Sequence, residues 1–237
     1  MHENLRENLA EIRRRINKSA EKSQRSADAI KLIAVSKTHP AADLLAAMLA
    51  GANIFGENKV QEAEGKIRQI GREKAEWHLI GNLQSNKARK AVRLFDVIHT
   101  LDSVELAERL ERICIEENVA NLSVFAQIDL AKEPTKSGID ERDLPELIAF
   151  LKNCARLKFD GLMTIPPFDD DAEKTRPYFR RLREIRDELK AQNAFSNDFG
   201  ELSMGMSGDF ETAIEEGATL VRIGTAIFGS RQSKISG

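Results

Sequence analysis

Short apolar runs alternate with helix-like patterns along most of the chain. Runs such as KLIAVS at 31–36 have the length and the β-branched composition of buried strands. The pattern predicts strands at 31–36, 52–57, 76–81, 95–101, 122–130, 157–165, 201–207 and 219–225. Helical spacing predicts helices at 41–49, 58–70, 84–94, 143–154, 171–191 and 209–217, another capped by Ser103, and a leading amphipathic helix with Leu5, Leu9, Ile12 and Ile16 on one face.

This alternation predicts a parallel sheet, and eight strand–helix units predict a closed (β/α)8 barrel of the TIM type. An open doubly wound sheet is the alternative, and it more often carries a glycine fingerprint after its first strand. Here that position reads SKTHPA, without glycine. We therefore expect one domain, in which residues 1–30 form an extra helix packed on a barrel of residues 31–237. Because the chain ends soon after the eighth predicted strand, we expect no second domain.

Charge and hydropathy exclude several kinds of partner. Of the 237 residues, 31% are charged, yet the net charge is only −2, so there is no general attraction to nucleic acid or membranes. The basic stretches RRR (13–15) and KARKAVR (87–93) lack interleaved aromatic residues and are predicted to be solvated helix faces. No apolar run approaches the ~18 residues of a membrane span, and the charged N-terminus argues against a signal peptide. We expect a cytoplasmic monomer.

Metal binding and disulfide formation are not indicated either. The four histidines are scattered without the spacing of metal ligands. The acidic run DDD at 169–171 precedes a predicted helix, where negative charge is favoured by the helix dipole. Cys114 and Cys154 form no paired motif and are expected to be reduced thiols.

Polar and small residues cluster where the predicted strands end, which is where barrel active sites lie. These residues are Lys37, Asn58, His78, Gly81, Asn82, Met163, Thr164, Met206, Ser207, Arg222, Gly224 and Thr225. Lys37 is the most informative, because it directly follows the apolar strand IAVS. It either extends its amine into water or holds that amine for chemistry at the barrel mouth.

The last two predicted strands favour a phosphate site. GMSGD at 205–209 and IGT at 223–225 place small residues and free backbone N–H groups after strands seven and eight, where barrels often bind phosphate. In a closed barrel these loops adjoin Lys37. Pyridoxal 5'-phosphate (PLP) would span the two, with its phosphate at one end and an aldehyde that forms a lysine Schiff base at the other. Arg222 would then meet the ring nitrogen. Ordinary capping residues and a structural ion pair of Arg222 are the alternatives.

Seven motifs resemble those of the pyridoxal phosphate homeostasis proteins, single-domain relatives of the alanine racemase barrel. They are VSKT (35–38), FGENKVQEA (55–63), WHLIGNLQSNK (77–87), KSG (136–138), GLMTI (161–165), LSMGMSGDFETAI (202–214) and VRIGTAIFG (221–229). The resemblance implies a (β/α)8 barrel with Lys37 as the Schiff-base lysine and with Ser207, Gly224 and Thr225 on the phosphate. It also implies Arg222 at the pyridine nitrogen and Asn58 and Met206 along the ring. His78 belongs to a family motif, and we include it among the cofactor-binding residues.

The resemblance implies a protein that binds, buffers and delivers PLP and so influences amino-acid and keto-acid balance, with apo forms of PLP-dependent enzymes as recipients. The residues themselves agree with a carrier. A racemase needs a base on each face of the substrate carbon, and the single tyrosine, Tyr178, lies in a predicted outer helix far from Lys37. An arginine partner also keeps the pyridine nitrogen unprotonated, which weakens the ring as an electron sink. A weak amino-acid racemase or lyase is the alternative function, and a phosphate-binding barrel without PLP is a third.

Overall fold

The computed structural model describes residues 2–132 and 137–229, and within them eight parallel strands close into a barrel in the order β1 to β8. The predicted (β/α)8 architecture is therefore confirmed. Lys136, the first residue of the KSG motif, lies outside the described residues. The strands are β1 (Lys31–Val35), β2 (Ile54–Glu57), β3 (Glu76–Leu79), β4 (Val97–Leu101), β5 (Leu122–Gln127), β6 (Leu157–Met163), β7 (Glu201–Ser203) and β8 (Leu220–Ile223).

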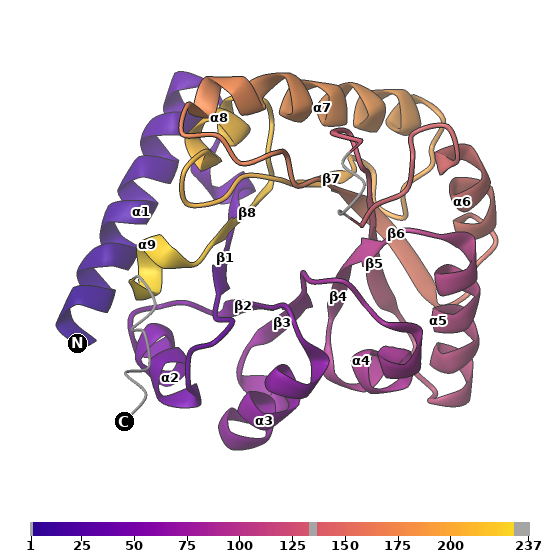
Figure 1. Ribbon diagram of the computed structural model, residues 1–237, viewed down its shortest axis with the longest axis horizontal. Helices are drawn as coiled ribbons and strands as arrows, with labels where there is room; N and C mark the ends of the chain where they lie inside the picture. The colour runs from indigo at the N-terminus through magenta and orange to yellow at the C-terminus, as the bar shows by residue number, and fades with distance from the viewer. Residues whose placement is uncertain (1, 133–136, 230–237) are drawn as a thin grey trace.

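Helices surround the barrel on all sides (Figure 1). They are α1 (His2–Lys22), α2 (Ala41–Leu49), α3 (Val60–Ile70), α4 (Ala88–Leu94), α5 (Val104–Glu116), α6 (Leu144–Leu151), α7 (Arg176–Ala191), α8 (Phe210–Glu215) and α9 (Thr225–Phe228). The leading helix α1 packs along α8, α9 and α2, with Leu9 and Ile12 buried against them. The short helix α9 was not predicted, because its four residues are too few to show helical periodicity.

Two hydrophobic layers hold the barrel together. The larger one fills the space between the helices and the outward-facing strand residues, and it contains Phe55, Trp77 and Phe159. The smaller one fills the barrel itself with Ile33, Ile54, Val97, Phe125, Met163 and Leu220. Both layers arise because successive strand residues point to opposite faces, and in a barrel with an outer ring of helices both faces are buried.

Six of the eight observed strands end earlier than the apolar runs that predicted them, whereas β2 and β4 end at the predicted residue. The clearest case is β7, which stops at Ser203 where the run 201–207 predicted a longer strand. Gly205 has a φ of 92°, and a Cβ there would lie 2.6 Å from Cβ of Ala213, so the chain turns against α8 at this point. Apolar residues beyond a strand end therefore line the mouth of the barrel instead of extending the sheet.

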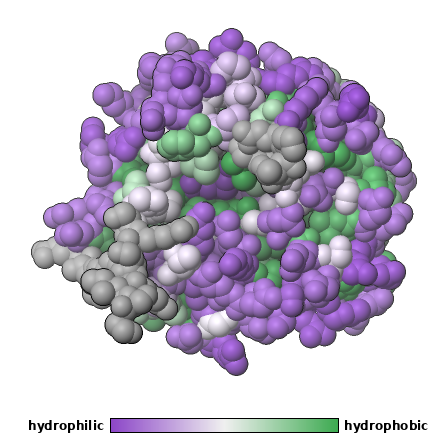
Figure 2. Space-filling model, viewed as in Figure 1, coloured by the Kyte–Doolittle hydropathy of each residue, from purple (hydrophilic) through white to green (hydrophobic). Residues whose placement is uncertain are grey.

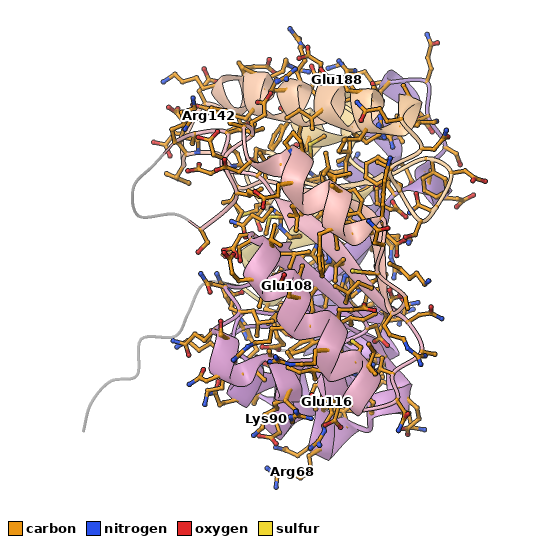
Figure 3. All side chains as sticks on the ribbon, turned by 90° about the vertical axis from the view of Figure 1, so that its right-hand side faces the viewer. Arg68, Lys90, Glu108, Glu116, Arg142 and Glu188 are labelled. Carbon is orange, nitrogen blue, oxygen red and sulfur yellow. The ribbon has the colours of Figure 1, made fainter. Side chains whose placement is uncertain are left out.

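The outer helices carry both acidic and basic residues, among them the labelled Arg68, Lys90, Glu108, Glu116 and Glu188 (Figure 3). The basic stretch 87–93 is compensated by neighbouring helices: Lys90 pairs with Glu64 at 2.8 Å, and Arg93 pairs with Glu117 at 2.7 Å. These pairs agree with the interpretation of 87–93 as a solvated helix face. No helix of the described residues combines the length and apolarity that a membrane crossing requires.

Candidate cofactor site

A cavity of about 390 Å³ opens at the carboxyl ends of the strands. Figure 2 shows the molecule from this end of the barrel, with hydrophobic residues near the centre of the face and hydrophilic residues around most of its edge. The cavity is lined by Val35, Lys37, Thr38, His39, Asn58, Ile80, Ile165, Pro167, Phe168, Asp169, Met206, Ser207, Gly208, Asp209, Arg222, Gly224, Thr225 and Gly229. Seven of the eight predicted cofactor residues are therefore brought together, although they come from four different strand–loop junctions.

Lys37 lies on a tight turn directly after β1. Its neighbour Thr38 has a φ of 69°, a left-handed conformation that is rare for a β-branched residue. The His39 N–H donates to the Ser36 carbonyl at 3.1 Å and closes the turn. Among the described residues the Lys37 amine has no hydrogen-bond or ion-pair partner, and its side chain is exposed at the cavity. The turn thus presents a free primary amine to the cavity.

A buried lysine beneath this turn holds it in place. Lys66 of α3 donates to the Ser36 carbonyl at 2.6 Å, to Oε1 of Glu57 at 2.6 Å and to Oε1 of Glu62 at 2.7 Å. The same Glu62 oxygen accepts the Thr38 N–H at 2.5 Å. Burial raises the pKa of Glu57, and the charge and hydrogen bond of Lys66 oppose that rise. Both residues that flank Lys37 are therefore fixed by one ionic network.

The loops after β7 and β8 form the opposite wall. Asp209 accepts the Met206 N–H at 2.6 Å and shapes the turn that carries Ser207. The backbone N–H groups of Ser207 and Gly208 have no partner among the described residues, and both residues line the cavity. Across from them, Thr225 begins the short helix α9. Ser207 Oγ accepts the Ala226 N–H at 3.5 Å. The two unpaired N–H groups, together with the hydroxyls of Ser207 and Thr225, form a suitable cradle for an anion.

Arg222 is the cation of the site. Its side chain projects from β8 and is only 4% exposed. It donates to Oγ of Ser203 at 2.7 Å and to the Thr164 carbonyl at 2.9 Å, and no carboxylate of the described residues lies within ion-pair distance. Burial lowers its pKa to about 10, so it stays protonated at neutral pH. A buried cation bonded only to neutral acceptors favours an electron-rich ligand at its open side.

Asn58 completes the wall after β2. Its Oδ1 is buried and has no hydrogen-bond partner among the described residues. Its backbone is held against Gly81, where an added Cβ would lie 2.3 Å from the Asn58 carbonyl oxygen. The sequence marked Gly81 only as a residue at a strand end, and its role is to allow this close approach of two loops. An unpaired oxygen in a cavity wall is an acceptor that a ligand group or a water can satisfy.

His78 is the one predicted cofactor residue that does not line the cavity. It is 1% exposed and lies inside the barrel, where its Nδ1 is 2.8 Å from Nε2 of His99. Sequence reasoning also missed His99, Ser203 and Lys66. The spacing of Glu62 and Lys66, four residues apart on a helix, was a detectable signal for the network below Lys37. Nothing local pairs His99 with Ser203, because they are separated by 104 residues.

The residues present fit PLP. The cavity offers a free amine at Lys37, an anion cradle at Ser207 and Gly208, and a buried cation at Arg222. Its volume lies within the range of ~300–1,000 Å³ that is usual for small-molecule sites. Asn58 Oδ1 has no hydrogen-bond partner and Arg222 has no carboxylate partner among the described residues. PLP would supply an interaction to each.

Residues 3–232 match the family model described as alanine racemase, N-terminal domain. The chain is 40% identical over 229 residues to the pyridoxal phosphate homeostasis protein of Aquifex aeolicus, covering 97% of this chain and 99% of that one. It is 42% identical over 227 residues to the protein of the same name from Escherichia coli K12, covering 94% and 95%.

Solved structures show the same likeness. PipY of Synechococcus elongatus, solved with PLP bound, superposes with a TM-score of 0.83 at 41% identity and covers 95% of this chain and 100% of that one. An alanine racemase of Clostridium difficile superposes with a TM-score of 0.72 at 18% identity, and this chain covers 58% of it. The racemase shares the fold of the barrel.

Proposed function

Because this chain belongs to the family of pyridoxal phosphate homeostasis proteins, we propose that it binds PLP covalently at Lys37 and buffers and delivers this cofactor in the cytoplasm. The observation that carries the proposal is the free amine of Lys37 opposite the anion cradle of Ser207 and Gly208, in a cavity whose buried cation, Arg222, lacks a carboxylate partner. The relative solved with PLP supports it.

Each wall of the cavity has one task in this proposal. Lys37 is the covalent attachment point. Ser207, Thr225 and the neighbouring backbone N–H groups hold the phosphate, with Gly224 giving the loop its close approach to β1, where an added Cβ would lie 3.2 Å from the Val35 carbonyl oxygen. Asn58 and Met206 border the ring. When bound, PLP supplies an aldehyde that condenses with a lysine amine and a pyridine ring able to withdraw electrons.

Arg222 favours retention of the cofactor over catalysis. A guanidinium only donates hydrogen bonds, so a pyridine nitrogen facing it remains an unprotonated acceptor. The ring then withdraws electrons less strongly, which disfavours transamination and related carbanion chemistry. We therefore expect a holding site rather than an efficient enzyme.

The position of the only tyrosine points the same way. Tyr178 lies on α7, beside Pro177 and Arg181, in a separate surface hollow. The described residues that line the PLP cavity include no tyrosine. A racemase that uses a lysine and a tyrosine as its two bases needs that tyrosine on the face of the substrate opposite Lys37, and none of the described residues lining the cavity provides it.

Borohydride trapping tests the site. Purified protein is incubated with PLP, reduced and digested, and the modified lysine is identified by mass spectrometry. We expect the adduct on Lys37, its loss in Lys37→Ala, and its retention in Lys59→Ala, a matched exposed lysine outside the cavity. An adduct of equal yield on another lysine in Lys37→Ala contradicts the assignment.

A second assay separates carrier from enzyme. Holo-protein is mixed with an apo-transaminase, whose recovery of activity reports transfer of PLP. In parallel it is incubated with L- and D-amino acids. We expect transfer and no efficient turnover. Robust turnover that disappears in Lys37→Ala would favour the alternative of a racemase or lyase. The same preparation, examined by light scattering, tests the expected monomer.

A further inference from the structure

A chain of buried polar groups runs through the barrel below the cavity. Arg222 Nη1 donates to Ser203 Oγ at 2.7 Å, and Ser203 Oγ is 2.9 Å from His99 Nδ1. His99 Nε2 is 2.8 Å from His78 Nδ1, and His78 Nε2 is 2.9 Å from Glu76 Oε1. The five residues come from four strands, β8, β7, β4 and β3, and they are assembled only when the barrel closes.

The chain connects two very different environments. His99 is fully buried, and its ring stacks on Phe125 with centroids 4.5 Å apart. Burial lowers the pKa of His99 well below its usual value, so its imidazole is neutral. At the far end, the Glu76 side chain is 43% exposed at the start of β3. The hydrogen bond from His78 lowers the pKa of Glu76, which keeps this carboxylate ionised.

Counting donors and acceptors gives one arrangement in which both imidazoles are neutral. Arg222 can only donate, so Ser203 accepts from it and has one hydroxyl proton to give. That proton goes to His99 Nδ1, which leaves the His99 proton on Nε2, directed at His78 Nδ1. His78 then carries its proton on Nε2 and donates to Glu76. All groups are satisfied, and both imidazoles are neutral with the proton on Nε2.

The opposite direction fails on charge and on hydrogen bonding. If His99 carried its proton on Nδ1, Ser203 would accept two bonds, and its own hydroxyl proton would have no partner in the chain. His78 would also have to donate from both nitrogens, to His99 and to Glu76, and would become an imidazolium that is 1% exposed. Burying such a charge is costly, whereas the first arrangement needs none between Arg222 and Glu76.

We propose that Ser203, His99 and His78 are positioning residues, which hold Arg222 through a one-directional hydrogen-bond relay that ends on Glu76. The inference rests on the proposed function, in which Arg222 faces the pyridine nitrogen of PLP. Two of its donors are committed to Ser203 and Thr164, so the long guanidinium is restrained where it lines the cavity. Aligned hydrogen bonds polarise one another, so the relay also partly compensates the buried charge with a solvent-exposed carboxylate.

Histidine tautomers test the relay without any cofactor. Long-range proton–nitrogen NMR spectra of ¹⁵N-histidine-labelled apo-protein at pH 7.5 distinguish the two neutral tautomers from imidazolium. We expect His78 and His99 to be neutral with the proton on Nε2. A proton on Nδ1 of His99, or a charged His78, overturns the relay. Failure of PLP to bind Lys37 would leave this result unaffected and is detected separately by borohydride trapping of the wild type.

Variants test whether the relay positions Arg222. Ser203→Ala removes the acceptor of Arg222 and the donor to His99, and we expect cofactor release at least about tenfold faster, the effect of one hydrogen bond to a charged group. We also expect a shifted absorption maximum of the bound cofactor, with trapping at Lys37 retained. Ser123→Ala is the matched control, because Ser123 bonds Asp160 outside the relay. A Ser203→Ala variant whose cofactor release rate and absorption maximum equal those of the wild type would refute the positioning role.

The outer end of the relay supplies a second pair of variants, at a side chain that is 43% exposed. Glu76→Gln keeps an oxygen that accepts from His78 Nε2–H, whereas Glu76→Leu removes the acceptor. We expect Glu76→Leu to change the tautomer signals and to speed cofactor release, and Glu76→Gln to restore the tautomers. Equal tautomer signals and equal release rates in Glu76→Leu and wild type would show that the relay does not act through Glu76 and would overturn the proposal.

Discussion

Replacing Lys66 by methionine tests how the Lys37 turn is supported. The side chains of Lys66 and Glu57 are 7% and 0% exposed, and the pair is 2.6 Å apart. Lys66→Met leaves the Glu57 carboxylate buried without a cation and breaks the bonds to Glu62 and to the Ser36 carbonyl. Removing one partner of a buried ion pair costs about 3–5 kcal/mol, because the remaining charge is uncompensated.

This loss is large enough to measure by melting. For a chain of this size, 1 kcal/mol shifts the melting temperature by about 2–4 °C, so Lys66→Met should melt about 6–20 °C below the wild type. The exposed Lys59→Met, which changes the same residue type at the start of α3, should melt within about 2 °C of it. The deficit should also appear as a lower denaturant midpoint with an unchanged slope.

The pH dependence identifies Glu57 as the cause. Burial raises the pKa of Glu57 above its usual 4.5, and Lys66 opposes this, so the variant should raise the pKa further. A raised carboxyl pKa favours the folded state when the group is protonated, and this contribution is lost as pH rises through the folded-state pKa. The loss of stability in Lys66→Met, relative to the wild type, should therefore be smaller at pH 5 than at pH 8.

The double variant decides the interpretation. Glu57→Gln keeps the oxygen that accepts from Ser36 and replaces the unpaired Oε2 by a neutral group, so Lys66→Met with Glu57→Gln should recover most of the lost stability. Borohydride trapping at Lys37 should be slower in Lys66→Met, because the turn loses an anchor. A Lys66→Met protein as stable as the wild type, or no recovery in the double variant, would refute the reasoning.

Two further predictions concern the walls of the cavity. Ser207→Ala and Thr225→Ala should each weaken PLP binding by about 1.5–3 kcal/mol in fluorescence titrations while borohydride trapping at saturating PLP persists, and unchanged affinity in both would place the phosphate elsewhere. Gly81→Ala should lower stability by about 1–3 kcal/mol and loosen cofactor binding, because the added Cβ would overlap the Asn58 backbone, 2.3 Å away. Gly65→Ala, on a helix with no atom within 4 Å of its added Cβ, should not destabilise the protein.

Local sequence patterns determined the architecture of this protein. Short apolar runs indicate buried strands, and apolar residues at a spacing of about 3.6 indicate helices. Eight such strand–helix units in succession favour a closed barrel, in which both faces of the sheet are covered. The same order placed Lys37 after β1, Ser207 after β7 and Arg222 within β8, and β8 pairs with both β1 and β7. Their convergence on one cavity could therefore be predicted.

Tertiary structure alone decided how these residues are held. Lys66 reaches Ser36 across 30 residues, and Ser203 reaches His99 across 104, so no short-range periodicity reports either contact. His78 shows the limit most clearly. Its motif predicted a place near the cofactor. Side chains alternate along a strand, so His78 does face the inside of the barrel, but it lies below the cavity and contacts His99 there. Sequence determines which residues face inward, whereas the closed barrel determines which of them meet.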